Sequence, residues 1–398
     1  MTGTDEDQLH AAALAALPGC GPARLRALVH TSDPLADVWR EVAAGRALSR
    51  PGVEAAVGGR AQAARLATSW ADVARRVDLA RLRARLEHER AVVAVLGRDG
   101  YPAALADDPD PPAVLFVAGM RADALDRSPK VALVGTRRCT HYGADVARQL
   151  GRDLTAAGVV VVSGLALGID GAAHEGALAS DAAGPHDEAS VPPVAVVGSG
   201  LDVIYPRRHR RLWHRVLAAG AVVTEAPLGA PADPWRFPLR NRIIAGLADV
   251  VVVVESHAAG GSMHTVQAAA DRGVPVMAVP GSVRSPSSAG TNRLLAEGVA
   301  PVLDADDVLV ALSLVARPTA DGAQRAPSAE IATEREAALD DVARAVLAAV
   351  DWTPTATETV LERTALSLGA VAAALTRLEL SGLVRRSGGW WERCAVDR

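Results

Sequence analysis

The chain has 398 residues, too many for one ordinary hydrophobic core, so its length predicts two or three domains. With 49% hydrophobic and 22% charged residues it has the composition of a folded globular protein, and no apolar run approaches the ~18 residues that cross a membrane. A formal net charge of −4 argues against a surface coated with positive charge for duplex binding, so any nucleic-acid site has to be local.

The first residues and the rare residue types exclude further classes of protein. The segment MTGTDEDQLH is acidic where a signal peptide is basic and then apolar, which predicts a cytoplasmic protein without membrane association. Cys20, Cys139 and Cys394 are far apart and odd in number, so we expect reduced thiols and no metal or redox pair. Lys130 is the single lysine and precedes a predicted strand, which excludes a P-loop ATPase and Schiff-base chemistry.

Residues 1–75 are predicted to form a small all-α domain of short helices separated by turns. The turn Leu17–Pro22 (LPGCGP) precedes the periodic segment ARLRALV, as in a helix-hairpin-helix or SAM-like domain. Such a hairpin can present backbone amides to a phosphate, but a Pro-Gly corner between two packed helices is common in any small helical domain. The sequence leaves both interpretations open.

Residues 76–312 change to short β-branched runs separated by helical segments. The runs are AVVAVLG, AVLFVAG, KVALVG, GVVVVSG, PVAVVGSG, AVVTE, DVVVVVES, PVMAVPG and APVLD. Continuous apolar runs followed by helices predict an extended α/β domain of Rossmann-like type, with a doubly wound, mostly parallel sheet buried on both faces. The polar segment 180–190 (SDAAGPHDEAS) has no periodicity and is predicted to be an exposed loop.

Residues 313–335 are polar, proline-containing and aperiodic, as expected of a linker, and residues 336–398 follow as a third domain. There DDVARAVLAAV is predicted to be a helix, Ser367 caps a second helix, and LVRR and WWER form a hairpin. Helices followed by a two-stranded wing predict a winged helix.

This third domain lacks the charge of a DNA reader. From Asp340 onward it holds seven arginines and eight acidic residues. Its recognition-helix candidate, LGAVAAALTRLELS, offers Arg377 alone as a cation, whereas a groove-reading helix presents several polar or basic residues. We therefore expect an accessory or protein-binding role there rather than duplex recognition.

The residues that follow the apolar runs are mostly glycines and hydroxyl residues, and in open α/β sheets ligands bind at these carboxyl ends of the strands. Such turns leave backbone N–H groups free at helix N-termini, where the helix dipole also favours an anion. The sequence therefore predicts a phosphate-binding site, although glycines also occur wherever a strand turns sharply into a helix. The candidate residues are Gly135, Thr136 and Arg137 after KVALV, and Ser163, Gly164, Gly168 and Asp170 after GVVVV.

A nicotinamide dinucleotide is the obvious alternative ligand for such a sheet, and the sequence argues against it twice. The first strand-helix turn reads GTRRCT rather than G-x-G-x-x-G. The second strand ends in Ser163 and Gly164, where a ribose-binding acid would stand. We therefore expect no cofactor.

The segment FPLRNRIIAG adds cations to the predicted site. Pro238 is predicted to begin a helix, so that Arg240, Asn241 and Arg242 lie in or near its first turn. Arginines set against the positive end of the helix dipole suggest a bound anion, although two solvated arginines would give the same pattern. The arginines 207, 208, 210 and 211 leave the same two explanations open.

Three aromatic residues stand close to these arginines in the sequence. Phe237 could stack on a base, as aromatic side chains do in single-strand binders, or pack as a staple that holds the helix. Tyr205 and Trp235 leave the same choice.

The sequence contains no convincing catalytic group. Asp170 and His174 are spaced i, i+4 and could pair as acid and base on one helix face, but a capping aspartate with a packed histidine is the commoner arrangement. His141, His257 and His264 show no metal-ligand spacing. We expect neither a catalytic residue nor a metal.

The order of the motifs resembles a known family. VGTRR, SGLALGID, GSGLDVIYP, TEAPLG, FPLRNRIIAGL, GGSMHT, AVPG and AGTNRLL occur as in the DNA-processing protein A (DprA/Smf) family, over roughly residues 92–303. The resemblance implies a non-enzymatic protein of natural transformation and recombination that protects incoming single-stranded DNA and loads RecA recombinase onto it. It also implies a homodimer formed through the Rossmann-like domain, and single-stranded-DNA-binding protein as a further partner.

The resemblance places the phosphate pocket at Gly135, Thr136 and Arg137, the loop 163–170, and Arg240 to Arg242. Three positions depart from the family pattern. Leu167 stands where many relatives carry Lys or Arg, His209 where Asn is common, and Gly260 where Ser is common. The first departure removes one possible phosphate contact.

Two alternatives to a DNA binder remain open. Related Rossmann-like proteins include nucleotide phosphoribohydrolases with a P-G-G-x-G-T-x-x-E motif, and the closest stretch here is Gly260–Thr265 followed by VQA, without the carboxylate that such a hydrolase needs. A scaffold that uses its winged helix for protein contacts is the other.

Overall fold

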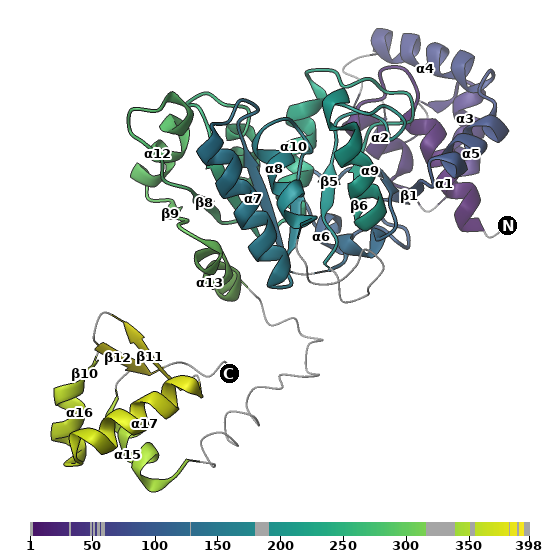
Figure 1. Ribbon diagram of the computed structural model, residues 1–398. Helices are drawn as coiled ribbons and strands as arrows, with labels where there is room; N and C mark the ends of the chain where they lie inside the picture. Colours follow the sequence, from purple (N-terminus) through teal and green to yellow (C-terminus); the bar gives the residue numbers. More distant parts are fainter. Residues whose placement is uncertain are drawn as a thin grey trace. The chain divides into compact units, whose positions relative to one another are not determined.

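The computed structural model describes residues 3–31, 33–47, 50, 52–53, 56, 60–127, 129–179, 191–315, 339–350, 355–381, 383–387 and 390–393. It divides into two compact units, Met1–Ala316 and Arg317–Arg398, which are described separately (Figure 1). The expected loop 180–190 and most of the expected linker 313–335 lie outside the described residues.

Within the described residues of the first unit, one sheet holds nine strands in the order β1-β2-β6-β5-β4-β3-β7-β8-β9. Neighbours from β6 to β9 pair in parallel, whereas β2 pairs antiparallel with both β1 and β6. Each strand falls in one of the nine predicted apolar runs, so the prediction of a doubly wound, mostly parallel sheet is confirmed. The strands are β1 (Val92–Val95), β2 (Val114–Ala118), β3 (Lys130–Gly135), β4 (Val160–Ser163), β5 (Val194–Val196), β6 (Ala221–Thr224), β7 (Val250–Glu255), β8 (Val276–Ala278) and β9 (Ala300–Pro301).

Helices cover both faces of this sheet (Figure 1). One face packs against α7 (His141–Ala156), α8 (Ile169–Ala177) and α13 (Ala305–Val315). The other face packs against α6 (Ala103–Ala106), α10 (Arg236–Leu247), α11 (Met263–Ala270) and α12 (Ala289–Ala296). Among the described helices, none has both the length and the apolar character needed to cross a membrane.

The N-terminal segment is helical, as predicted. Its helices are α1 (Gly3–Ala15), α2 (Pro22–Val29), α3 (Leu35–Ala43), α4 (Arg60–Ala74) and α5 (Leu79–His88). They share one buried cluster with the end of the sheet at β1 and β2 and with α9 (Arg210–Ala219), including Leu14, Phe116 and Trp213. The indole Nε1 of Trp70 donates to the carbonyl oxygen of Pro18 at 2.8 Å, which holds the turn between α1 and α2 against α4.

The second unit is a winged helix. Its elements are α15 (Asp341–Ala349), β10 (Thr355–Ala356), α16 (Thr357–Thr364), α17 (Leu368–Leu380), β11 (Val384–Ser387) and β12 (Trp390–Arg393), and the strands pair antiparallel in the order β10-β12-β11. Asp340 and Ser367 cap α15 and α17 by accepting from the amides of Ala343 and Ala370. The predicted helices, cap and hairpin are confirmed, while Gly388 and Gly389 lie outside the described residues.

Candidate functional site

A recess of about 590 Å³ opens at the carboxyl ends of β3 and β7, with the start of α10 as one wall. Glycine turns and helix starts surround it, as the strand-end rule predicts. The structure brings most of the predicted site residues together here. Those that line the recess are Gly135, Thr136, Arg137, Asp170, Phe237, Arg240 and Asn241.

Two predicted glycines shape the recess, because neighbouring groups lie too close to them to leave room for a side chain. A Cβ at Gly164 would lie 1.4 Å from Arg240 Nη1 and 2.5 Å from Asp170 Oδ2, so only glycine leaves room for that arginine. Gly168 has φ +82°, and a Cβ there would lie 2.3 Å from the carbonyl oxygen of Thr136. Ser163 is fully buried and donates from Oγ to the carbonyl oxygen of Leu133 at 2.6 Å, which ties the ends of β3 and β4.

Arg240 places a buried, positively charged guanidinium group in the lining of the recess. Its side chain is buried, with Nη1 donating to the carbonyl oxygen of Val196 at 3.0 Å and lying 3.9 Å from Asp170 Oδ2. Burial raises the pKa of the Asp170 carboxyl, and the charge of Arg240 opposes that shift. The guanidinium is therefore held by the protein before any ligand arrives.

Arg242 lies elsewhere. Its Nη2 donates to Glu225 Oε2 at 2.5 Å, its Nε lies 3.2 Å from Asp110 Oδ2, and its side chain is 8% exposed, outside the lining of the recess. Burial raises the pKa of Glu225, and the charge of Arg242 opposes that shift.

The helix α10 begins at Arg236, two residues before the predicted start at Pro238. A proline fits this first turn because the N–H groups there have no partner within the helix.

The aromatic residues meet arginines at the rim. The guanidinium carbon of Arg137 lies 4.4 Å from the ring centre of Phe237, and the ring of Tyr205 lies 5.6 Å from the same ring at 38°. Arg137 is exposed and Tyr205 is 42% exposed. On the same helix start, Arg236 lies 4.3 Å from the ring centre of Trp235. Aromatic faces beside guanidinium groups are suited to stacking with bases.

The loop after β7 completes the recess and was missing from the predicted site. This loop and the start of α11 contribute His257, Ser262, His264 and Thr265 to the lining, and the turn after β3 contributes Arg138. Asn241 Nδ2 donates to the carbonyl oxygen of Gly261 at 3.3 Å, which joins this loop to α10. The signal was available, because GGSMHT follows an apolar run as the other predicted turns do.

The start of α7 is bound to a buried carboxylate. Glu255, at the end of β7, accepts hydrogen bonds from the backbone N and from Oγ1 of Thr140, both at 2.8 Å. Gly143 lies so close that a Cβ there would be 2.5 Å from Glu255 Oε2. Sequence reasoning missed this contact, since a glutamate at a strand end is indistinguishable from a solvated one.

Neither Asp170 nor His174 is arranged as an acid-base pair. His174 is fully buried, and desolvation lowers its pKa to about 4, while Asp170 faces Arg240. Within the described part of the chain, no three His, Cys, Asp or Glu side chains group as metal ligands.

Comparison with known proteins identifies the family. A family model described as DNA recombination-mediator protein A matches residues 92–313, and a DprA winged-helix model matches residues 330–389. The chain belongs to the DprA/Smf family. Protein Smf of Synechocystis sp. is 31% identical over 315 residues, covering 73% of this chain and 76% of that protein. Protein Smf of Escherichia coli is 35% identical over 306 residues, covering 75% and 77%.

A solved DprA structure has the same fold. The X-ray structure of DprA from Streptococcus pneumoniae superimposes with a TM-score of 0.58 at 29% identity, covering 78% of this chain and 98% of that one. The resemblance found in the motifs is thus confirmed, together with the Rossmann-like and winged-helix domains. Membership of the DprA/Smf family assigns the chain to DNA processing and recombination.

Proposed function

We propose that the chain binds single-stranded DNA in the recess and acts by binding rather than by turnover. The observation that supports this best is the group formed by Arg137, Phe237 and Tyr205 at the rim, above the buried cation of Arg240. Cations for phosphates and aromatic faces for bases are the two components of single-strand binding sites.

The arrangement favours a single strand over a duplex. Bases in a duplex are stacked on one another, so an aromatic ring beside a phosphate site is useful only where a base is free to leave its neighbours. The net charge of −4 also fits a local site better than a broad electrostatic surface.

Binding of labelled oligonucleotides, followed by fluorescence anisotropy, tests this proposal. We expect tighter binding of single than of double strands, and an affinity about 10- to 100-fold lower for the double variant Arg137→Ala/Phe237→Leu, since stacking alone contributes ~1–3 kcal/mol per base. Arg293→Ala is the control, because Arg293 is exposed on α12 and pairs with Glu297. Equal affinity for duplex, or an unaffected double variant, would refute the proposal.

Membership of the DprA/Smf family supports a more specific role. We propose that the bound strand is passed to RecA in the cytoplasm, in competition with single-stranded-DNA-binding protein, and that the chain works as a homodimer. Exposed apolar side chains at the end of the first unit, Leu303, Val310 and Leu314, support self-association through this domain.

RecA loading is measured as ATP hydrolysis by RecA on single strands coated with single-stranded-DNA-binding protein. The chain should shorten the lag, and Arg137→Ala/Phe237→Leu should not. Release of free base from nucleoside monophosphates would instead favour the phosphoribohydrolase alternative.

A further inference from the structure

The start of α10 is a ridge between two hollows. Pro234, Phe237, Pro238 and Asn241 line the recess, and their i, i+3, i+4, i+7 spacing places them on one side of the helix start. Trp235, Arg236 and Leu239 line a second hollow of about 570 Å³ on the other side. We call it the hairpin pocket, because the turn between helices α1 and α2 also lines it. Arg240 borders both.

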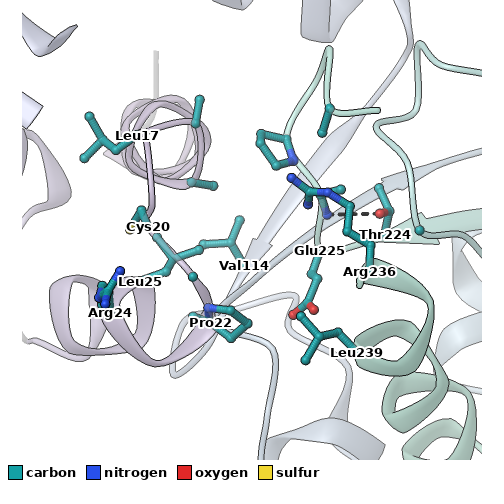
Figure 2. A pocket seen from close by; sticks show the side chains of 18 of the residues that line it. Leu17, Cys20, Pro22, Arg24, Leu25, Val114, Thr224, Glu225, Arg236 and Leu239 are labelled. Carbon is teal, nitrogen blue, oxygen red and sulfur yellow. Dashed lines mark hydrogen bonds between the residues drawn. The ribbon is translucent and has the colours of Figure 1, made fainter. Parts of the chain in front are cut away.

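The opposite wall of the hairpin pocket is the N-terminal helical segment. Figure 2 shows Leu17, Cys20 and Pro22, from the turn between α1 and α2, on one side and Arg236 and Leu239 on the other. The ends of β2 and β6 lie between them, with Val114 and Glu225 labelled. The pocket thus joins the N-terminal helices to the edge of the DNA site.

The lining chemistry suits a base better than a phosphate. Apolar side chains such as Leu17, Pro22 and Leu239 form most of the wall, and Glu225 adds acceptor oxygens. The arginines in the lining (24, 236 and 240) already have partners within the protein, at the carbonyl oxygen of Gly19, the carboxylate of Asp233 and the carbonyl oxygen of Val196. Glu225 accepts from Arg242 through Oε2, and a carboxylate has about four acceptor positions. It can therefore also accept from the amino group of a base.

Each side of the ridge carries an aromatic ring with an arginine against its face. Phe237 faces Arg137 at 4.4 Å on the recess side, and Trp235, which is 53% exposed, faces Arg236 at 4.3 Å on the other. The two sides are close together, because a Cβ at Gly198, which lines the hairpin pocket, would lie 3.3 Å from the ring of Phe237.

We propose that the hairpin pocket receives one unstacked base of the same single strand, and that it prefers bases with an exocyclic amino group to thymine. The proposal rests on the proposed function, because the strand is first held in the recess. It assigns a binding role to the turn between α1 and α2.

A filling substitution tests the pocket without disturbing the core. Gly21 lines the pocket with φ −71°, and a Cβ there would meet no atom within 4 Å, so Gly21→Trp occupies the hollow at little structural cost. Gly369→Trp is the matched control, because Gly369 is equally open and lies in the winged helix. Trp235→Ala is a second variant, which removes an exposed ring.

Affinities are measured for oligo-dC and oligo-dT of about 4 and about 12 nucleotides, within the ~4–16-nucleotide range of single-strand sites. Gly21→Trp should weaken binding of the longer oligo-dC about tenfold, of the longer oligo-dT less, and of the short strands hardly at all. A crosslink from a 5-iodocytosine strand to the peptide 15–25 should be lost in the same variant.

Three results overturn the inference, and they are distinguishable. If Gly21→Trp and Trp235→Ala bind long strands as the unmodified chain does, while Arg137→Ala/Phe237→Leu binds them about 10- to 100-fold more weakly, the pocket has no role and the proposed function stands. Equal weakening for oligo-dC and oligo-dT refutes the amino-group preference. If the unmodified chain binds no single strand, the proposed function fails and the pocket assignment fails with it.

Discussion

His174 is the buried titratable group with the clearest effect on stability. It lies in α8 with its ring fully enclosed, and desolvation lowers its pKa from the ordinary value of 6.5 to about 4. The unfolded chain therefore binds a proton at a pH where the folded chain does not. The contribution of His174 to stability is therefore complete above about pH 6.5 and is lost as the pH falls towards 4.

Replacement of His174 by leucine should remove this pH dependence. When the pH is lowered from about 7 to about 4.5, the free energy of unfolding should fall for both chains. We expect the fall to be about 2 kcal/mol larger for the unmodified chain than for His174→Leu. Urea denaturation at the two pH values measures it. His214→Gln on α9 is the control, because His214 is exposed; an unchanged pH dependence in His174→Leu would show that another group dominates the acid limb.

Part of the recess could be predicted from the sequence, but the position of Arg242 could not. The residues after two apolar runs, together with the segment FPLRNRIIAG, identified seven of its lining residues, including Arg240. Two residues apart on a helix differ by about 200° in direction, so Arg240 and Arg242 could not both face one recess. The partners Glu225 and Asp110 are distant in sequence, and no local pattern announces them.

Helices α7 and α8 pack through a pair of glycines. A Cβ at Gly151 would lie 2.3 Å from the carbonyl oxygen of Ala173, and a Cβ at Gly176 would lie 2.0 Å from that of Arg148. Each helix thus presents a glycine to the backbone of the other. This contact positions α8 and hence Gly168 and Asp170 at its start.

Gly176→Ala should therefore separate the two helices. We expect it to lower the free energy of unfolding by about 3 kcal/mol, the upper end of the usual cost of overpacking, and to weaken single-strand binding by shifting the start of α8. Gly369→Ala in α17, where a Cβ meets no atom within 4 Å, should cost nothing. Chemical denaturation of both variants decides the point, and equal stabilities would exclude the proposed close packing.

The elements themselves were largely predictable, and their pairing was not. Short apolar runs, most of them rich in valine, identified each strand of the sheet in the described part of the chain, because β-branched side chains favour strands and most of these strands are buried on both faces. The antiparallel pairing of β2 with β1 and β6 left no trace in those runs, since a fully buried strand has the same composition in either direction.

The two units have separate hydrophobic cores. The winged helix buries its own cluster, with Val346, Leu375 and Trp391, apart from the three clusters of the first unit. The N-terminal helices, in contrast, share a cluster with Phe116 of β2. Sequence composition could not distinguish these cases, because an apolar helix face has the same pattern whether it packs within its own domain or against a sheet.

A chain that ends after residue 316 should therefore fold and bind. We expect its thermal unfolding midpoint to lie within about 3 °C of the corresponding transition in the full chain, and its single-strand affinity to change by less than about twofold, because both hollows lie in the first unit. Scanning calorimetry and anisotropy measure these quantities. A large loss of affinity would assign DNA contacts to the winged helix.

The contact between Glu255 and Thr140 also affects ligand choice. In dinucleotide-binding domains, the helix that follows the first strand of the parallel sheet binds the pyrophosphate at its N-terminus. The helix in the corresponding place here is α7, which follows β3. Here the carboxylate of Glu255 already accepts from Thr140 at the N-terminus of α7. The backbone N and Oγ1 of Thr140 are therefore already engaged within the protein, and a pyrophosphate at this helix start would have to compete with the carboxylate for them.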